Sequence, residues 1–331
     1  MLAEVDQLAA ETSFSGVVRI DRDGEPDDVE AYGMAHRAAG VANTVDTRFG
    51  TASGTKALTA LTVVSLIEDD VLSLATTARS LLGADLPLIA DDVTVEHLLA
   101  HRSGIGDYLD EDTDFDLDDH LLPVPMHELA TTEQYVPVLD GHRTKFAAGS
   151  AFSYCNGGFV VLALLAERAT QTPFHELVEA RVCAPAGMHD TAFLRSDDLP
   201  TGVALGYLAE TGNRTNVLHL PVRGNGDGGI YSTAADIHAL WSALLAGRIV
   251  SPVWVAEMHR PRSDVPSESA RYGLGFWLHA TSDAVMFVGC DAGVSFRTVH
   301  SPTVGVTHTV LANTTRGAWP ITRALDEVLL A

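Results

Sequence analysis

The sequence predicts an α/β protein of the α+β type, with one antiparallel sheet flanked by helices and an inserted all-helical subdomain. Strand-like segments occur near both ends of the chain, whereas the middle shows helical segments joined by acidic or Gly- and Pro-containing loops. Separate runs of strands and helices are typical of this class. The chain has 331 residues, 46% of them hydrophobic and 20% charged, so it can bury a full core.

The N-terminal part is expected to form a helix and a hairpin. Apolar residues repeat at helical spacing within residues 1–12. Hydrophobicity alternates over residues 15–20, Asp23-Gly24 marks a turn, and residues 29–33 resume an extended pattern. Alternation on both sides of a turn signal predicts an antiparallel pair of strands.

The middle of the chain is predicted to be helical. Residues 57–67 are apolar and contain no Gly or Pro, which indicates a buried helix that begins near Ser53. Further helical segments are expected over residues 95–100, 157–169 and 174–183.

Strand patterns return toward the C-terminal end. Four short candidates span residues 272–279, 284–288, 294–299 and 304–311, and an amphipathic helix is expected over residues 321–330. Together with the N-terminal hairpin, these strands predict a single sheet built from both ends of the chain.

The net charge argues against a nucleic acid or an anionic membrane surface as partner. It is −23, and no compact basic cluster is visible. Residues 1–12 carry acids where a signal peptide has a basic start, and no segment reaches the ~18 apolar residues of a membrane span. The expected location is therefore cytoplasmic. Cys155, Cys183 and Cys290 do not make a disulfide framework.

No metal and no cofactor are expected. The acidic run from Asp107 to Asp119 lacks the central Gly and final Glu of a calcium loop and is expected to be a solvated loop. His97 and His101 stand four residues apart, as two ligands on a helix would, but no third ligand is near. Packing or helix capping is the favoured role of both.

The stretch Ser53-Gly54-Thr55-Lys56 places a nucleophile-type hydroxyl one helical turn before a lysine. Residues i and i+3 share a helix face, so Lys56 Nζ is expected to reach Ser53 Oγ. The helix N-terminus presents free backbone N–H groups, which suit a developing oxyanion. The spacing thus supplies a nucleophile, a base and an anion stabiliser, although a single match of this kind is a weak signal.

A second constellation is Tyr154 and Asn156, in a Gly-flanked stretch ahead of an apolar helix. The free pKa values of Tyr and Lys are about 10 and 10.4, so either group needs tuning to act as a base near neutral pH. Neighbouring cationic and hydrogen-bonding groups provide such tuning. Asn156 could hold Lys56 or a substrate amide. Taken alone, a helix cap and a packed aromatic would explain the same residues.

Six stretches occur in a fixed order, at residues 47–56, 93–105, 148–156, 185–191, 228–236 and 272–276. The resemblance that they carry covers the chain from about residue 13 to the C-terminal end. In this order they resemble the serine beta-lactamase and penicillin-binding-protein family, on the branch of class C beta-lactamases, D-alanyl-D-alanine carboxypeptidases and beta-lactamase-like esterases. The third stretch matches P-G-x-x-F-x-Y-x-N, with Ala148 in place of the usual Pro. The resemblance implies a beta-lactamase/transpeptidase-like fold, with its active site at the junction between a sheet domain and a helical subdomain. The sheet domain would comprise residues 1–78 and 222–331, and the helical subdomain residues 79–221.

The resemblance also implies a role for each matching residue. Ser53 would be the acylated nucleophile, and Lys56 the partner that takes its proton. Tyr154 would serve the leaving group and the hydrolytic water, so the base is assigned to Lys56 and Tyr154 jointly. Asn156 would orient Lys56 and the amide of the substrate.

One motif departs from the family pattern. On the strand across the cleft, the family has Lys or His, then Thr or Ser, then Gly. Here Cys290, Asp291 and Ala292 stand at these positions. The second oxyanion donor, beside the N–H of Ser53, would fall on the backbone N–H of Gly293. The lost cation and the added carboxylate disfavour substrates that bear a free carboxylate.

The sequence therefore predicts a serine hydrolase that acylates Ser53 with a small ester or amide lacking a free carboxylate. Tyr108 would contribute to the substrate mouth, together with the residues of the departing motif. A beta-lactamase or a D-amino-acid-specific peptidase is an alternative, which would need a cation such as Arg297 or Arg223. A non-catalytic binding protein on the same fold is a second alternative. Acyl transfer to an acceptor other than water and the oligomeric state both stay open.

Overall fold

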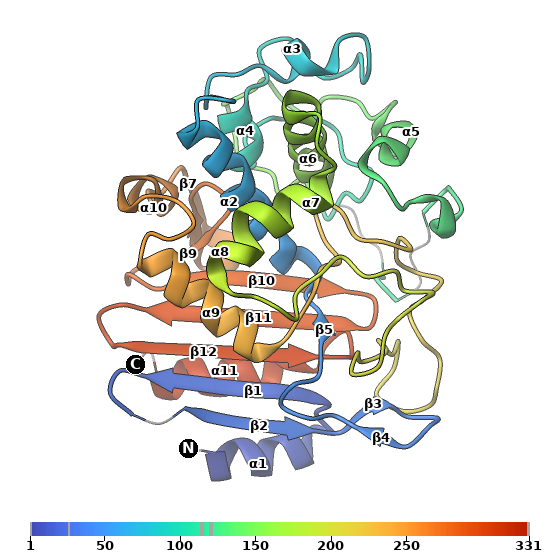
Figure 1. The fold of residues 1–331 in the computed structure, drawn as a ribbon, viewed down its shortest axis with the longest axis vertical. Helices are drawn as coiled ribbons and strands as arrows, with labels where there is room; N and C mark the ends of the chain where they lie inside the picture. Colours follow the sequence, from blue (N-terminus) through green and yellow to red (C-terminus); the bar gives the residue numbers. More distant parts are fainter. Residues whose placement is uncertain (1, 26, 113–115, 119–121, 330–331) are drawn as a thin grey trace.

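An eight-stranded antiparallel sheet forms one half of the molecule, in the order β2-β1-β12-β11-β10-β9-β8-β7 (Figure 1). The structure is a computed structural model that describes residues 2–25, 27–112, 116–118 and 122–329. The N-terminal part contributes β1 (Gly16–Arg22) and β2 (Asp28–Tyr32). The C-terminal part contributes β7 (Ser263–Val265), β8 (Ala270–Tyr272), β9 (Trp277–His279), β10 (Val285–Asp291), β11 (Val294–Ser301) and β12 (Val306–Ala312). Since β1 pairs directly with β12, both ends of the chain build one sheet, as predicted.

Two terminal helices cover one face of this sheet. They are α1 (Leu2–Glu11) and α11 (Ala318–Leu329), and they contact each other. Alternate strand residues such as Val18 and Val310 pack against them in one apolar cluster. Val17 points the other way, into the main core.

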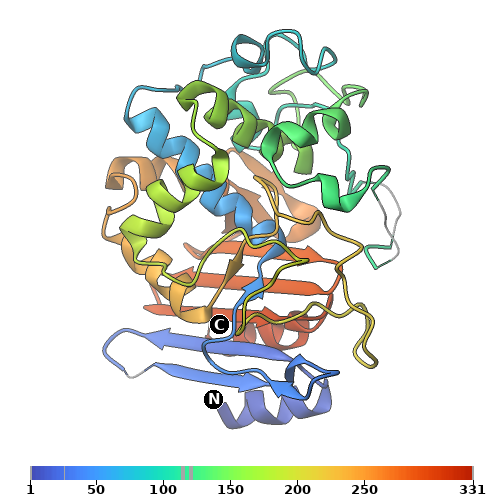
Figure 2. The ribbon, with the colours of Figure 1, turned by 45° about the vertical axis from the view of Figure 1, so that its right-hand side comes forward.

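The opposite face carries the helices that position the site. The central one is α2 (Thr55–Glu68), which is buried from Thr55 to Ile67, and α9 (Ala234–Leu245) lies against β12. The helical half also contains α3 (Ala78–Leu82), α4 (Val95–Leu99), α5 (Val136–Leu139), α6 (Asn156–Thr170), α7 (Phe174–Val178), α8 (Ala184–Ala186) and α10 (Pro252–Met258). Of these, α6 and α7 pack directly on α2. Figure 2 shows these helices gathered above the sheet, with α2 running down toward β10. A helix apolar on all sides needs such cover from every direction.

Short elements connect the two halves. β3 (Met34–His36) pairs with β4 (Val41–Ala42), and β5 (Phe49–Gly50), just before the nucleophile stretch, pairs with β6 (Tyr231–Ser232). Four 3₁₀ turns and one π-helical turn complete the elements of the described residues, namely Ala52–Gly54, Met126–Glu128, Thr132–Tyr135, Pro266–Glu268 and the π-helical Glu179–Cys183.

Several predicted elements have different bounds in the structure. The strand expected over 272–279 is split into β8 and β9, because Gly273 N–H donates to Phe276 O (2.9 Å) across a turn in which Gly275 has φ of +82°. The helix expected over 174–183 changes to a π-helical turn after Val178. Helices α9 and α10 and strand β7 were not predicted. Residue 330 of the expected last helix, and residues 113–115 and 119 of the acidic run, lie outside the described residues.

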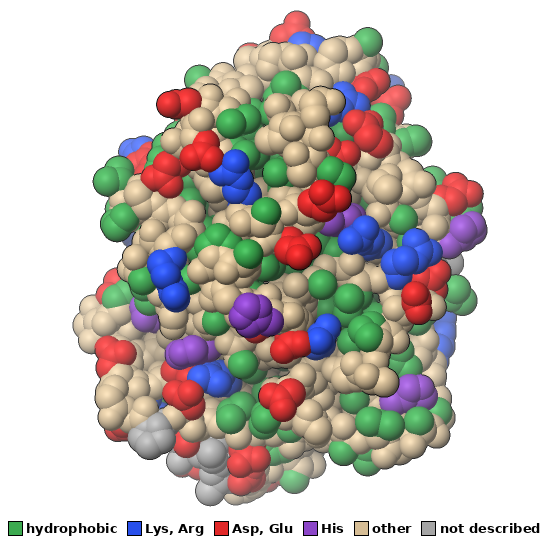
Figure 3. All heavy atoms as spheres, in the orientation of Figure 1, with side chains coloured by type: hydrophobic (Ala, Val, Ile, Leu, Met, Phe, Trp, Pro, Cys, Tyr) green, Lys and Arg blue, Asp and Glu red, His purple; other side chains and the backbone are tan. Residues whose placement is uncertain are grey.

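The surface carries no continuous basic patch on the face drawn in Figure 3, where Lys and Arg side chains are scattered among acidic ones. None of the helices in the described ranges is long and apolar enough to cross a membrane. In the same ranges, no three His, Cys, Asp or Glu side chains are grouped so that they could hold a metal ion.

Candidate active site

Ser53 lies in the tight 3₁₀ turn Ala52–Gly54, between β5 and the start of α2. Ala52 has φ of +46°, a left-handed conformation that is uncommon for a residue with a side chain and costs on the order of 1–3 kcal/mol. Strand β10 passes close to this turn. A Cβ added to Gly289 would lie 3.0 Å from Ser53 N and 2.0 Å from Thr51 O, so only glycine permits the approach. The turn thus holds the hydroxyl between a helix N-terminus and a strand.

Lys56 is 2% exposed, and its Nζ makes three contacts. It lies 2.8 Å from Ser53 Oγ, which is the contact predicted from the i,i+3 spacing. It also lies 2.8 Å from Asn156 Oδ1 and 2.7 Å from the backbone oxygen of Asp227. Burial lowers the pKa of Lys56 below its ordinary value, although the negative charge of Asp227 acts in the opposite direction.

The three partners of Lys56 differ in what they can do. Asn156 Oδ1 and Asp227 O can only accept, so they take two hydrogens from Nζ. Ser53 Oγ can donate as well as accept. An ammonium would donate to all three partners, whereas a neutral amine would direct its lone pair at the Ser53 hydroxyl. Burial shifts the pKa of Lys56 toward the neutral form.

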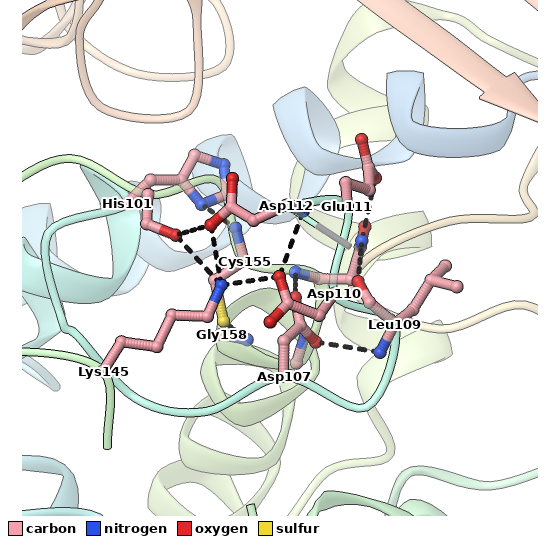
Figure 4. Close-up of polar contacts among 12 residues, drawn as sticks. His101, Asp107, Leu109, Asp110, Glu111, Asp112, Lys145, Cys155 and Gly158 are labelled. Carbon is pink, nitrogen blue, oxygen red and sulfur yellow. Dashed lines mark hydrogen bonds and ion pairs between the residues drawn. The ribbon is translucent and has the colours of Figure 1, made fainter. Parts of the chain in front are cut away.

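Asn156 is fixed by a network from the loop that follows Asp107. Its Nδ2 donates to Leu109 O (3.0 Å) and to Glu111 Oε1 (2.9 Å), which leaves Oδ1 directed at Lys56. The Asp107 carboxylate accepts the backbone N–H of Asn156 and that of Gly157 (2.8 Å) at the start of α6. Asp107 and Glu111 lie within this group of contacts (Figure 4). Burial raises the pKa of Asp107 to about 6.

The Tyr154 ring lies beside Lys56, whose Nζ is 4.9 Å from the ring centroid. The ring stacks on Trp277, with centroids 6.0 Å apart. Burial raises the pKa of the Tyr154 phenol well above its ordinary value, and Glu111 adds to the rise, while a hydrogen bond with Ser53 opposes it. In the free protein Tyr154 is therefore a proton donor.

His101 positions the backbone on both sides of Tyr154. Ser153 N–H donates to His101 O (3.0 Å), and Cys155 N–H donates to His101 Nδ1 (3.0 Å; Figure 4). The imidazole also packs on the Tyr154 ring at 4.4 Å between centroids. Burial, and then the charge of Lys56, lower the pKa of His101 well below its usual value. His97 instead caps α4 in a reciprocal pair with Thr94. Packing and capping are thus the structural roles of the two histidines, as predicted.

A cavity of about 280 Å³ opens beside Ser53. Its walls include apolar side chains from several loops and from the start of β11, namely Leu109, Leu117, Leu122, Leu194, Leu220, Pro221, Val222 and Val294. Three carboxylates, those of Glu111, Asp227 and Asp291, also line it, whereas none of the described lining residues is Lys or Arg. The cavity therefore combines apolar walls with acidic groups.

Tyr108 and two residues of the departing motif line this cavity. The Tyr108 hydroxyl donates to Asp227 Oδ2. Cys290 Sγ donates to Thr315 O at 3.3 Å. Asp291 accepts the N–H of the next residue, Ala292, at 3.0 Å, and burial raises its pKa to about 7. Asp291 therefore carries much of its charge only above neutral pH.

Ala292 and Gly293 do not line the cavity. They form a two-residue turn between β10 and β11, since Asp291 pairs with Val294. The Ala292 oxygen accepts from Asn216 Nδ2 (2.8 Å), and the Gly293 N–H donates to Thr315 Oγ1 (2.8 Å). The Gly293 N–H is thus engaged within the protein and is not available as the second oxyanion donor in this structure.

The cations considered for carboxylate recognition are also engaged elsewhere. Arg297 pairs with Asp326 on α11 at 2.5 Å, and Arg223 Nε donates to Phe193 O at 2.9 Å. Neither side chain lines the cavity beside Ser53.

Sequence reasoning missed the roles of Asp107, Glu111 and Asp227. The acidic run was expected to be a solvated loop, but Asp107 is only 7% exposed and anchors α6. A lone hydrophobic pair in that run, Tyr108-Leu109, was the available signal that its first part packs inward. Asp227 contacts Lys56 through its backbone oxygen, and a backbone contact leaves no signal in the side-chain pattern.

A Ser–Lys–Tyr constellation with a buried lysine, between an antiparallel sheet and a group of helices, defines a serine hydrolase site of the beta-lactamase type. The Beta-lactamase family model matches residues 3–331, so the chain belongs to that family.

Comparisons with known proteins agree with this assignment. The crystal structure of a penicillin-binding protein from Bacillus halodurans is 33% identical, covers 98% of this chain and 99% of its own, and superimposes with a TM-score of 0.92. Esterase EstB of Burkholderia gladioli is 30% identical over 325 residues, covering 85% of this chain and 79% of the esterase. A D-aminopeptidase of Brucella anthropi is 29% identical over 80% of this chain, which spans only 49% of that relative. The chain thus matches about half the length of some relatives.

Proposed function

We propose that the protein hydrolyses esters or small amides without a free carboxylate, through an acyl-enzyme on Ser53. The observation that carries the proposal is the buried Lys56 Nζ, which lies 2.8 Å from Ser53 Oγ. The same Nζ is hydrogen-bonded to Asn156 Oδ1 and to the backbone oxygen of Asp227. A base with a lowered pKa at hydrogen-bond distance is what activates a serine hydroxyl near neutral pH.

The proposed chemistry has two stages. Ser53 Oγ attacks the carbonyl carbon while its proton passes to Lys56 Nζ, and the carbonyl oxygen becomes an oxyanion near the Ser53 N–H at the positive end of α2. Tyr154 then gives its proton to the leaving group, and Lys56 returns a proton to Tyr154. In the second stage, water attacks the acyl carbon, loses its proton to the same pair, and Ser53 regains its own.

The second oxyanion donor is proposed to come from the open edge of β10. Strand β9 pairs with β10 only at Val285 and Met286, so the edge from Val288 to Asp291 on that side lacks a strand partner. This edge packs on the turn that holds Ser53. An unpaired strand edge carries free backbone N–H groups, which replace the donor expected from Gly293.

The exclusion of carboxylate substrates follows from the charge of the cavity. Glu111, Asp227 and Asp291 line it, and no Lys or Arg among the described lining residues offsets them. A substrate carboxylate would be repelled and would find no ion-pair partner.

A matched pair of esters tests this exclusion. p-Nitrophenyl butyrate and mono-p-nitrophenyl succinate share a leaving group and a similar acyl length, but only the succinate carries a carboxylate. At pH 8 we expect kcat/KM for the butyrate to exceed that for the succinate by at least about tenfold, equal to about 1.4 kcal/mol. Equal values, or faster turnover of a chromogenic cephalosporin, would instead support the beta-lactamase alternative.

The second candidate is a peptidase or amidase for D-amino acids with a free α-ammonium group. The acidic cavity favours it, since an ammonium group would be attracted where a carboxylate is repelled. The similarity of the chain to a D-aminopeptidase also supports this second candidate. Release of p-nitroaniline from D-alanine p-nitroanilide, but not from its L-isomer or its N-acetyl derivative, would establish this specificity.

A further inference from the structure

We propose that a second groove, beyond the catalytic cavity, binds the distal apolar part of the substrate's acyl group. This inference rests on the proposed function and names the substrate class as esters or amides of medium-length, unbranched apolar acids. The groove has a volume of about 350 Å³ and shares three lining residues with the cavity beside Ser53, namely Leu122, Ser196 and Val222. The two spaces therefore adjoin each other at these three residues.

The position of the acyl group follows from the place of Tyr154. Tyr154 and Trp277 line a separate small cavity that also reaches Ser53, and neither residue lines the larger one. Since Tyr154 serves the leaving group, the leaving group departs on its side. The acyl group therefore extends into the cavity that leads to the second groove.

The walls of the groove suit an aliphatic chain. Apolar side chains make up most of them, namely Leu122, Val124, Met126, Val217, Leu218 and Val222. Of the three polar members, His127 and Asp197 are exposed, and Asp197 is paired with Arg195 at 2.9 Å, whereas Ser196 is half-buried. Leu218 is 76% exposed, so most of its side chain is open to a ligand in the groove.

The groove is held open by backbone hydrogen bonds between the segments that form it. Val222 N–H donates to Met126 O (3.0 Å), and Ser196 N–H donates to Val222 O (2.7 Å). Three loop segments far apart in the sequence are thereby tied side by side. A preformed groove binds a flexible chain at a lower cost than one that must assemble around it.

The combined size is suitable for a substrate larger than an acetyl ester. Small-molecule sites typically measure about 300–1,000 Å³. The catalytic cavity alone is near the lower limit, whereas the two adjoining spaces taken together fall well inside this range.

A chain-length series tests the proposal. Full burial of one methylene group corresponds to about a fourfold gain, so kcat/KM for p-nitrophenyl esters is expected to rise at least about tenfold from acetyl to octanoyl. Leu218→Asp should lower the octanoyl/acetyl ratio at least about fivefold, because a carboxylate would face the chain, whereas Leu218→Met should keep the ratio. Val253→Asp is the matched control: Val253 is also 76% exposed, but it lies on α10, outside the groove, and its substitution should leave the ratio unchanged.

The outcomes separate the subsite from the catalytic site. Turnover that does not increase beyond the butyryl ester, or an equal loss of the ratio in Leu218→Asp and Val253→Asp, would overturn the subsite while leaving the hydrolase intact. Absence of turnover with every ester, in folded protein whose Ser53 also resists acylation, would overturn the proposed function and the subsite together.

Discussion

Replacing Asp291 by Asn should stabilise the folded protein at alkaline pH. Asp291 lines the cavity, and the hydrogen bond of its Oδ1 with the N–H of Ala292 (3.0 Å) can be kept by the Asn oxygen. Burial, and then the charge of Asp227, raise the pKa of Asp291 from the usual value near 3.8 to about 7. The ionised form of Asp291 is thus less stable in the folded protein than in the unfolded chain.

The magnitude and its sign follow from proton linkage. A raised pKa in the folded state means that the folded protein holds the proton more tightly, so the cost of ionisation is absent below about pH 4 and grows until the pH exceeds about 7. A rise of about three in pKa corresponds to about 4 kcal/mol. Since Asp291 lies at the edge of an open cavity, we expect about 2–4 kcal/mol of added stability for Asp291→Asn at pH 8 and almost none at pH 4.

Urea unfolding of both proteins at several pH values between 4 and 8 measures this difference. Asp46→Asn is a suitable control, because Asp46 is exposed and its substitution should change the free energy of unfolding by less than about 0.5 kcal/mol. Equal stability of wild type and Asp291→Asn at pH 8, or a gain that is the same at pH 4, would refute the reasoning that the buried charge is unpaired.

Three further predictions concern the site. Lys56→Met should lower kcat/KM for p-nitrophenyl butyrate by about 10²–10⁴, because the base in contact with Ser53 is lost; a fall below tenfold in an assay of the folded variant would assign the base elsewhere. The butyrate/succinate ester preference should increase between pH 5.5 and 8, as Asp291 ionises with a pKa of about 7, and a pH series should show this increase abolished in Asp291→Asn. The double variant Cys290→Lys with Asp291→Thr restores the family's cation and hydroxyl, so steady-state kinetics should show the preference against the succinate ester reduced at least about tenfold; an unchanged preference would mean that other groups exclude the carboxylate.

The central constellation was predictable because it depends on local spacing and on an ordered series of motifs. Ser53 and Lys56 share one face of one helix, so their contact follows from helical geometry. Tyr154 and Asn156 were noted as a pair in a Gly-flanked stretch, and the resemblance supplied their catalytic roles. The structure brings Asn156 to Lys56 across 100 residues of sequence. The sheet built from both ends followed from the distribution of alternating segments.

The parts that were missed depend on tertiary context. The role of Gly293 was inferred from the family motif on the strand across the cleft. In the structure β10 ends at Asp291 and the chain turns back through Ala292-Gly293, which directs the Gly293 N–H to Thr315. The charge of Asp107 suggested exposure, yet two N–H groups at the start of α6 provide partners that only the folded chain brings near. Buried acids of this kind cannot be recognised from composition.

Intact-mass labelling with a fluorophosphonate, on wild type and on Ser53→Ala, tests the central claim most directly when it is combined with a p-nitrophenyl ester assay. The structure predicts one covalent adduct on the wild type, with both the adduct and ester turnover lost in Ser53→Ala. No adduct and no turnover in correctly folded wild-type protein would contradict the hydrolase and leave a binding protein on the same fold.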